Sequence, residues 1–492
     1  MIPAPEFDDI YVISDLHIGG PGWKQIFRQG DLLAAFIRSR AKGAVRRRVA
    51  LIINGDSVDF IADKKATYFD PEGAVGKLDA IIDDKNFADV FKALSEFVQV
   101  ENRFLVITLG NHDLELALPW VREHFKNRLS NGDYAAKGRI TLAFEGTGYT
   151  ARVADKSIIC VHGNEFDPWN VCDYEVLRRQ GRDLHRGCTV DPWTPNAGTK
   201  LVVDAMNDIK KDYAFVDLLK PETEAVIPTL AALDPDKKPQ LSNVVGVVSK
   251  LQWDKVRKRM GFLSAGEEEE AGPLLEKESG GGSESLDRLL GEAFADARGG
   301  QGGNGEELLD ALEDDLDTDP LDMLEGDGAE QLGAVSGIWN WMRGKGPAEL
   351  LYEALKNLVS NKDFDRGHQD ETYRRVTEHV RGFDIVCTGH THFEKSISHG
   401  RRQYFNSGTW VPLIKLTDLM MQSAKTFERV YEIFSACRTV DDFENPKNLF
   451  DGDSLLLKRP AVVEIVTRNG AATAALKRVE RTATGIRLTT PR

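Results

Sequence analysis

The sequence predicts an α/β protein that is interrupted by a large, mainly helical insertion. Apolar strands and amphipathic helical stretches alternate along the first third of the chain, as they do in βαβ units. Each of these strands runs into a loop that carries Asp, Asn or His, and the same pattern returns near residue 383. The chain has 492 residues, enough for about two to four domains, so its length is compatible with an interrupted core.

The predicted elements follow one another in a regular order. Apolar strands are expected at 10–13, 49–53, 104–108, 157–161, 383–387 and 403–405. Helical patterns are expected at 32–37 and 87–100. Near the C-terminus, 462–466 and 471–475 flank Asn469 and Gly470, a strong short-range signal for a β-hairpin. We expect this hairpin to complete a sheet.

The insertion is expected to occupy 164–380, between core parts 1–163 and 381–492. Its first part, up to about 262, has helical patterning, which returns at 348–359 and 372–380. Residues 264–334 are acidic and rich in Gly, a composition that buries too little apolar area to offset chain entropy. We expect this segment to be disordered or weakly helical. The insertion as a whole is interpreted as a cap over the core.

Bulk composition narrows the class of protein. The formal net charge is −15, but residues 267–330 alone carry −19, so the rest of the chain is near neutral. The net charge therefore does not indicate what kind of partner the rest of the protein binds. The five cysteines are scattered and odd in number, which disfavours a disulfide framework or a thiolate zinc site. The N-terminus lacks a signal-peptide pattern, and no apolar stretch approaches the roughly 18 residues of a membrane span. A cytoplasmic location is expected.

Five short polar motifs follow the predicted strands. In order they are Asp15-x-His17, Gly55-Asp56-x-x-Asp59, Gly110-Asn111-His112-Asp113, His162-Gly163 and Gly389-His390-x-His392. Each alone has an ordinary explanation as a turn, a helix cap or a buried histidine. Together they place five of the ten histidines at strand ends. Open α/β sheets bind ligands at the carboxyl ends of their strands, so these loops are expected to converge on a metal site.

The spacing of the histidine pair adds a local expectation. In an extended chain, side chains at i and i+2 leave the same face, so His390 and His392 are expected to aim at a common point. Asp15 and His17 have the same spacing.

This ordered set closely resembles the calcineurin-like metallophosphoesterase superfamily, over about 8–163 and 381–412 with the terminal hairpin included. The resemblance implies a four-layer αββα sandwich with two metal ions at the strand ends. It implies Asp15, His17 and His392 as ligands of one metal, and Asn111, His162 and His390 as ligands of the other. Asp56 would bridge the two ions. One branch of the family, the UDP-diacylglucosamine pyrophosphatases, often has His-Gly-Asp at the fourth motif, where this chain has Asn164.

The chemistry of phosphoester cleavage accounts for such a set of ligands. Two divalent ions about 3.5 to 4 Å apart neutralise the anionic ester and activate a water molecule. Ligation by oxygen and nitrogen without thiolate suits Mn²⁺, which we name first, or Fe or Zn²⁺. The predicted activity is hydrolysis of a phosphodiester, phosphomonoester or pyrophosphate bond, on a nucleotide, lipid-linked or nucleic-acid substrate.

Further residues are assigned around the metals. The resemblance implies that His112 protonates the leaving-group oxygen or stabilises its charge, and Asp113 would orient its ring, unless Asp113 only caps the following helix. Asp59 is expected to orient a ligand histidine. Arg178 and Arg182 recur at helical spacing and would bind a second phosphate, or simply form a solvated helix face interrupted by Gly181.

Two other functions stay open at this stage. Basic clusters at 46–48, 210–211, 374–375 and 401–402 would suit a repair-type nuclease. A non-catalytic scaffold of the same fold is the other alternative, although His112 and every ligand position are present. The acidic segment would suit recruitment of a protein partner, and Trp339 and Trp341 would suit either a substrate-contacting cap or packing of the insertion.

Overall fold

The computed structural model describes residues 4–62, 67–167, 169–207, 210–219, 346–358 and 364–491. The chain forms two compact units. The first comprises Met1–Val203, Asn361–Leu413 and Leu457–Arg492, and the second comprises Asp204–Ser360 and Ile414–Leu456. The predicted acidic segment 264–334, both tryptophans of the insertion and the part of the helical pattern after residue 219 lie outside the described residues.

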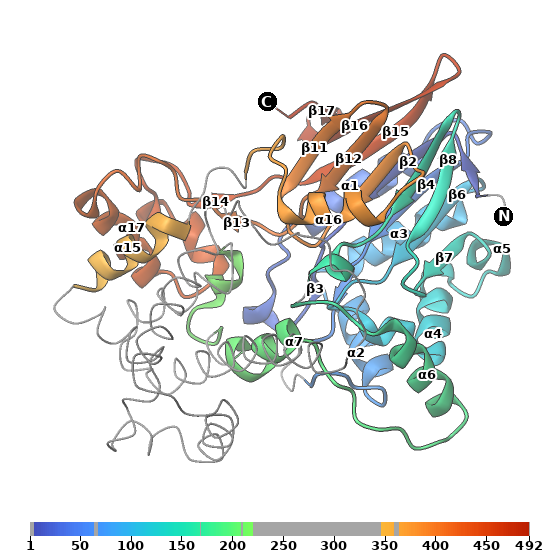
Figure 1. Ribbon diagram of the computed structural model, residues 1–492, viewed down its shortest axis with the longest axis horizontal. Coiled ribbons are helices and arrows are strands. Elements are labelled where there is room, and N and C mark those ends of the chain that lie inside the picture. Colours follow the sequence, from blue (N-terminus) through green and yellow to red (C-terminus); the bar gives the residue numbers. More distant parts are fainter. Residues whose placement is uncertain are drawn as a thin grey trace, which may run out of the picture. The chain divides into compact units, whose positions relative to one another are not determined.

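The first unit contains two large sheets (Figure 1). The seven-stranded sheet has the order β17-β16-β15-β2-β4-β6-β7, and the six-stranded sheet has the order β1-β8-β9-β10-β12-β11. In the first sheet the strands are β2 (Asp9–Ile13), β4 (Val49–Asn54), β6 (Arg103–Thr108), β7 (Ile140–Ala143), β15 (Ala461–Arg468), β16 (Ala471–Thr482) and β17 (Gly485–Thr489). In the second they are β1 (Glu6–Phe7), β8 (Tyr149–Val153), β9 (Lys156–Cys160), β10 (Ile385–Thr388), β11 (Glu394–His399) and β12 (Arg402–Ser407). A small sheet pairs β3 (Ile18–Gly19) with β5 (Val58–Asp59).

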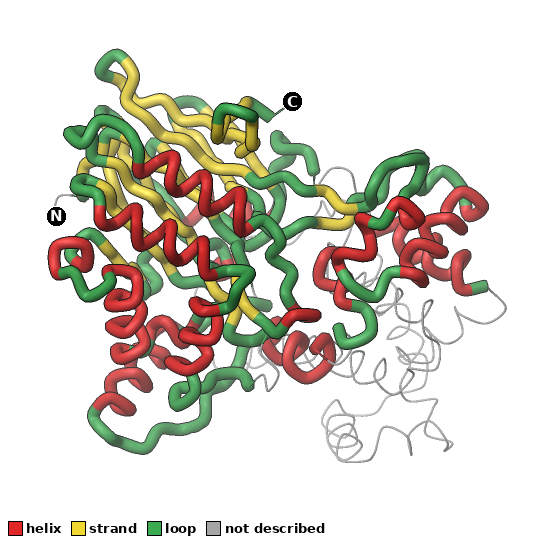
Figure 2. The backbone as a smooth tube through the Cα atoms, turned by 180° about the vertical axis from the view of Figure 1, so that it is seen from behind, coloured by secondary structure: helices red, strands yellow, loops and turns green. Residues whose placement is uncertain are grey.

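Helices cover the outer faces of both sheets. The helices on the side of the seven-stranded sheet are α1 (Gly30–Ala41), α2 (Ala74–Asp83), α3 (Ala88–Gln99), α4 (Pro119–Ser130) and α5 (Tyr134–Lys137). Seen from behind, two long helices lie across the strands of this sheet (Figure 2). Helix α16 (Glu371–His379) packs on the six-stranded sheet. Helices α6 (Tyr174–His185) and α7 (Ala197–Leu201) and short 3-10 turns at Gly22–Lys24, Leu114–Ala117 and Asn164–Phe166 complete the unit.

The alternation of side chains along the strands separates three apolar layers. Tyr11 and Ile13 of β2 face the helices, whereas Ile10 and Val12 face the six-stranded sheet. On β9, Ile158 faces the seven-stranded sheet, whereas Ile159 faces α16. Because both faces of these strands are buried, their sequences are continuously apolar, as expected for parallel strands. The predicted four-layer αββα sandwich is therefore confirmed.

Most predicted elements of the core are present. The terminal hairpin forms as expected, with Arg468 opposite Ala471 and positive φ angles at Asn469 and Gly470. It completes the seven-stranded sheet because β15 pairs antiparallel with β2. The sandwich is thus built from the two ends of the chain.

The described part of the second unit contains α15 (Pro347–Leu358), α17 (Ala424–Ala436), a π-helical turn at Val202–Met206 that begins at its border, and 3-10 turns at Ala214–Leu218, Val440–Glu444 and Pro446–Asn448. Strands β13 (Leu413–Ile414) and β14 (Leu456–Leu457) pair with each other in a two-stranded sheet. Phe215 stacks on Phe434, with ring centroids 5.2 Å apart. Residues 414–456, assigned above to the core, lie in the same unit as α15, and α17 packs against α15. Helix α16, assigned above to the insertion, packs on the six-stranded sheet of the core. None of the described helices has the length and apolar character that a membrane crossing requires.

Candidate metal centre

The loops after five parallel strands meet at one edge of the sandwich. They bring together two groups of side chains, Asp15 with His17 and His392, and Asp56 with His162 and His390. In each group, the atoms able to bind a metal lie within 4.8 Å of one another. All six side chains come from positions directly after β2, β4, β9 or β10. The predicted convergence of the strand-end loops is therefore present in the structure.

Asp56 belongs to the second group and also faces His17 of the first. Its Oδ2 atom is 3.2 Å from Nε2 of His162 and 3.7 Å from Nε2 of His17. Its Oδ1 atom accepts a hydrogen bond of 2.9 Å from the backbone N–H of His112. One carboxylate oxygen therefore faces both groups while the other is fixed by the third loop, which is the arrangement a bridging ligand needs.

The backbone at these positions adopts an uncommon conformation. Asp15, His17, Asp56, His390 and His392 all have φ between 46° and 68°, in the left-handed region. Residues without glycine's freedom are rare there, and each such residue costs on the order of 1 kcal/mol or more. These five are half of the ten non-glycine residues with positive φ in the described chain. Concentrated strain of this kind is characteristic of functional sites.

The loops are held together by direct contacts. A Cβ atom on Gly110 would lie 2.1 Å from Oδ1 of Asp56, so only glycine allows these two loops to approach this closely. The backbone N–H groups of Leu16 and His17 both donate to the carbonyl of Asp56. The backbone N–H of His390 donates to the carboxylate of Asp15, at 3.0 Å. The site is therefore a connected network rather than a set of independent loops.

Two buried atoms indicate that the site fits a cation. Among the described residues, Oδ1 of Asn111 and Nε2 of His162 are buried and lack a hydrogen-bond partner. The opposite ring nitrogen of His162, Nδ1, lies 2.8 Å from the carbonyl oxygen of Asn54 and donates to it, because a carbonyl only accepts. This bond directs Nε2 toward Asp56 as the ligand atom, a common arrangement for metal-binding histidine. Oxygen and imidazole nitrogen atoms without thiolate suit Mn²⁺, Fe or Zn²⁺.

The electrostatics of the centre are dominated by Asp56. Burial alone would raise the pKa of Asp56, but the nearby His162 and His112 rings hold it well below its usual range. Burial would likewise lower the pKa of His162, yet the Asp56 carboxylate raises it to about 10. At neutral pH His162 is therefore protonated opposite an ionised Asp56, and a divalent cation bound here would displace the proton.

The carboxylate beside His112 is Asp59, not Asp113. Oδ2 of Asp59 lies 3.3 Å from Nδ1 of His112 and 3.7 Å from Nδ1 of His17. Burial raises the pKa of Asp59, but the His112 and His17 rings lower it far below its usual range, so Asp59 is a carboxylate. Asp59 therefore contacts His17, a candidate metal ligand, as expected. It also contacts His112, a contact that was expected of Asp113.

Asp113 has a different set of partners. Its Oδ1 accepts from the backbone N–H of Gly110, at 2.7 Å, and its Oδ2 accepts from the backbone N–H and the hydroxyl of Ser57, at 2.8 and 2.9 Å. It makes no side-chain capping bond to the turn that follows it. Asp113 therefore braces two loops of the centre. The sequence analysis expected Asp113 either to orient His112 or to cap the following turn with its side chain. The observed contacts with Gly110 and Ser57 differ from both expectations.

The two histidines of the last motif separate. Nε2 of His392 lies 3.0 Å from Nε2 of His17 and 3.4 Å from Oδ1 of Asp15, whereas Nε2 of His390 lies 2.9 Å from Oδ2 of Asp167. The expectation of a common target was wrong because it assumed an extended chain, and both residues have positive φ. The separation agrees with the two ligand groups that the family resemblance implied.

Asp167 is a site residue that the sequence analysis missed. Burial raises its pKa, but its contact with His390 lowers it to about 2. Its carboxylate also accepts from the backbone N–H of Trp169 and from the side-chain amide of Asn170, and Oδ1 of Asn170 lies 3.4 Å from Nδ2 of Asn111. The only signal in the sequence is a polar loop after the fourth strand, which does not distinguish Asp167 from Glu165.

The two arginines expected to bind substrate lie on the exposed face of α6. Arg178 bonds Glu175 and Arg182 bonds Asp183, both on the same helix, and neither contacts a ligand residue in the described chain. Gly181 does not interrupt the helix, which continues to His185. Instead, a Cβ there would lie 3.3 Å from Cδ of Pro119, so the glycine allows close packing.

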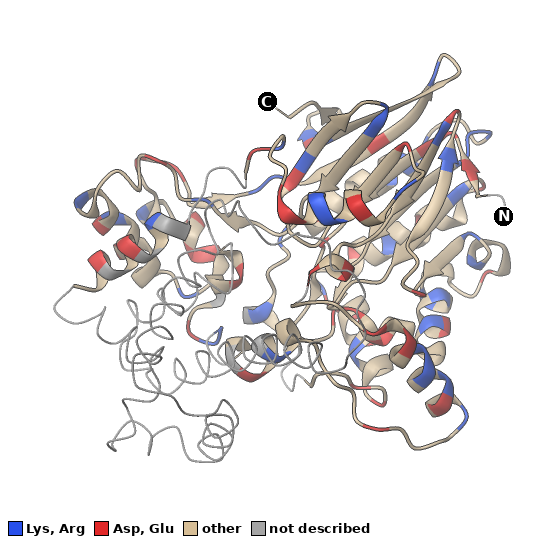
Figure 3. Cartoon of the chain, in the orientation of Figure 1, with Lys and Arg blue, Asp and Glu red and all other residues tan. Residues whose placement is uncertain are grey.

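The basic clusters expected of a nuclease are largely engaged in local contacts. Arg47 pairs with Asp9, Arg402 donates to the end of α16, and Lys210 pairs with Asp217. Basic and acidic segments are interspersed along the helices and strands of each unit (Figure 3). Cations that are paired locally contribute less to binding a nucleic-acid backbone, so these contacts do not favour the nuclease alternative.

Comparison with known proteins agrees with this geometry. A family model described as calcineurin-like phosphoesterase matches residues 9–221. This match includes four of the five motifs. Over these residues the chain is therefore similar to the calcineurin-like phosphoesterase family, as the ordered motifs predicted. No curated protein matches the sequence closely.

Proposed function

We propose that this protein is a dinuclear metal-dependent phosphoesterase that cleaves a phosphodiester, phosphomonoester or pyrophosphate bond. The observation that carries the proposal is the position of Asp56, whose Oδ2 faces His17 on one side and His162 on the other. A single carboxylate between two ligand groups suits a pair of cations at short separation.

The residues divide into two ligand sets. Asp15, His17 and His392 would hold one ion, Asn111, His162 and His390 would hold the other, and Asp56 would contact both. The bound ions would supply neutralisation of the phosphate oxygens and a lowered pKa for the attacking water. We name Mn²⁺ as the metal to test first, with Fe and Zn²⁺ as alternatives.

The protein supplies the proton for the leaving group. His112 lies beside the centre, and its ring centroid is 4.6 Å from that of His17. Nδ1 of His112 faces Asp59, whose negative charge favours the protonated ring. The other ring nitrogen, Nε2, would then donate its proton to the leaving-group oxygen. Asp59 thereby orients the general acid, and Asp113 keeps the Gly110 loop beside Asp56.

Metal content and hydrolysis measured on the same samples test the proposal. The full-length chain, loaded with Mn²⁺, should hydrolyse bis(p-nitrophenyl) phosphate and contain two metal equivalents. Asp56→Asn should lose bound metal and more than about 10²-fold of the turnover, since it weakens both sites. Asp451→Asn, an exposed aspartate of the second unit that also has positive φ, is the matched control and should retain both. Normal metal content and turnover in Asp56→Asn would contradict the proposal.

A further inference from the structure

A pocket adjoins the metal centre on the side of His392. It is lined by Phe364, His392, Phe393, Glu394, Thr409, Val411, Leu413, Leu457 and Arg459, all of the first unit. Its walls come from the loop after β10, the segment after β12 and the residues between β14 and β15. His392 also belongs to the ligand group of Asp15 and His17, so the pocket opens directly beside that group.

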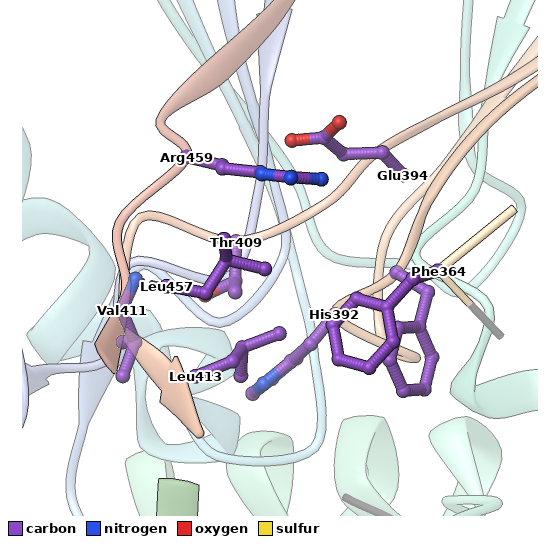
Figure 4. A pocket seen from close by; sticks show the side chains of 9 residues that line it. Phe364, His392, Glu394, Thr409, Val411, Leu413, Leu457 and Arg459 are labelled. Carbon is purple, nitrogen blue, oxygen red and sulfur yellow. Dashed lines mark hydrogen bonds between the residues drawn. The ribbon is translucent and has the colours of Figure 1, made fainter. Parts of the chain in front are cut away.

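One wall of the pocket is apolar. Val411 and Leu413 are buried and Leu457 is half-buried, and Figure 4 shows Leu413 beside His392 and Leu457 on the side toward Arg459. Phe364 lies opposite, with its ring centroid 5.1 Å from that of Phe393. The pocket is small and open to solvent, so it admits one short group rather than a long chain.

The charge at the far end of the pocket is positive. Glu394 is occupied by Arg478, which donates from two nitrogens to the two carboxylate oxygens. Arg459 is exposed and, in the described chain, forms no ion pair. Burial and then the neighbouring Arg478 lower the pKa of Arg459 and the nearby Glu394 raises it, and the guanidinium stays charged at neutral pH. Figure 4 shows the Arg459 side chain at the opposite end of the pocket from His392.

We propose that this pocket receives the organic group of the phosphoester substrate. The inference rests on the proposed function, since it places the reacting phosphate at the ligand group that includes His392. The group is compact and apolar where it passes Leu413 and Leu457, and it carries an anionic substituent that pairs with Arg459. A carboxylate or a second phosphate supplies this anion equally well, because guanidinium binds either through paired hydrogen bonds.

Phosphonates test this assignment without any turnover, because their carbon–phosphorus bond is not an ester. Binding of methylphosphonate, phenylphosphonate and para-carboxyphenylphosphonate to the Mn²⁺-loaded full chain is measured by calorimetry. We expect phenylphosphonate to bind about tenfold more tightly than methylphosphonate, from burial of the ring. The carboxyl group should add a further factor of about ten through Arg459. A bisphosphonate of similar length distinguishes phosphate from carboxylate as the preferred anion.

Variants separate the two parts of the pocket. Arg459→Gln should reduce the preference for the carboxyphenyl over the phenyl ligand to near one, and Arg459→Lys should retain part of it. Leu457→Ser should reduce the preference for phenyl over methyl to about threefold or less. The matched controls Arg468→Gln and Leu419→Ser change an exposed arginine and an exposed leucine outside the pocket and should keep both preferences.

The outcomes distinguish this inference from the proposed function. Equal preferences in Arg459→Gln and the natural protein, or no preference for phenyl over methyl, overturn the pocket assignment even if phosphodiesters are hydrolysed. Phosphonate binding with the expected preferences but without hydrolysis of any phosphoester overturns the proposed function and leaves the pocket as a binding site.

Discussion

Asp59 Oδ2 lies 3.3 Å from Nδ1 of His112, and the same oxygen lies 3.7 Å from Nδ1 of His17. One buried carboxylate therefore contacts both a metal-ligand candidate and the histidine proposed as general acid. This shared contact couples the orientation of His112 to the metal centre, because a shift of either ring changes the environment of the other.

Replacement of this carboxylate should impair turnover more than stability. Asp59→Asn is expected to lower kcat by about 10- to 100-fold, because a neutral amide no longer favours the protonated His112 ring. Asp113→Asn should instead reduce the free energy of unfolding by about 1 to 3 kcal/mol, since Asp113 accepts bonds from Gly110 and Ser57. Steady-state kinetics and urea unfolding of both variants measure the contrast. Equal effects of the two substitutions on kcat would show that Asp59 has no special relation to His112.

Removal of the proposed general acid should leave the metals in place. His112→Ala is expected to retain its metal content and lose about 10²-fold or more in turnover, because His112 donates a proton and is not assigned as a ligand. The control His124→Ala removes a histidine of α4 that pairs with Asp79. It should change neither quantity. Undiminished turnover in His112→Ala would refute the catalytic assignment.

Asp167 should support metal binding through His390. The carboxylate accepts from Nε2 of His390 at 2.9 Å, so Asp167→Asn weakens the control over that ring. We expect the affinity for Mn²⁺ to fall by about 10- to 100-fold in equilibrium dialysis. Asp183→Asn, on the exposed helix α6, is the matched control and should bind as the natural protein does. An unchanged affinity in Asp167→Asn would mean that its contact with His390 has no part in the centre.

Glu115 should make the stability of the core depend on pH. Burial raises the pKa of Glu115 from 4.5 to about 7, although its Oε1 accepts a bond from the backbone of Asp70. Ionisation of Glu115 therefore opposes folding, and the cost grows as the pH rises from about 4.5 to about 7 and is constant above that. Glu115→Gln removes the charge and keeps an acceptor. The variant should come closest to the natural protein at about pH 4 and exceed it by up to about 3 kcal/mol at pH 8.

Denaturant unfolding of both proteins across this range measures the difference. A gain that is the same at every pH would indicate that the ionisation of Glu115 does not contribute. A gain that appears only below pH 5 would have the wrong sign.

The class of fold and the general position of the site were predictable from the sequence. The apolar strands are recognisable because both of their faces are buried, and Asn469 with Gly470 specifies a turn by local conformational preference alone. The polar residues directly after the strands were predictable as a group, because the carboxyl ends of parallel strands meet at one edge. These features depend on residues close together in the chain.

The assignment of partners was decided only by the tertiary structure. Whether Asp59 or Asp113 faces His112 depends on how the loops after β4 and β6 approach each other, and adjacency in sequence favoured the wrong one. The positive φ angles at His390 and His392, which direct the two rings to different groups, exist because surrounding loops fix them against local preference. Tertiary packing also decides that Asp167 contacts His390, that Arg459 lines the pocket and that Arg178 is exposed. Sequence patterns report which face of an element is buried, but the contacts between loops far apart in the chain depend on packing that no local pattern encodes.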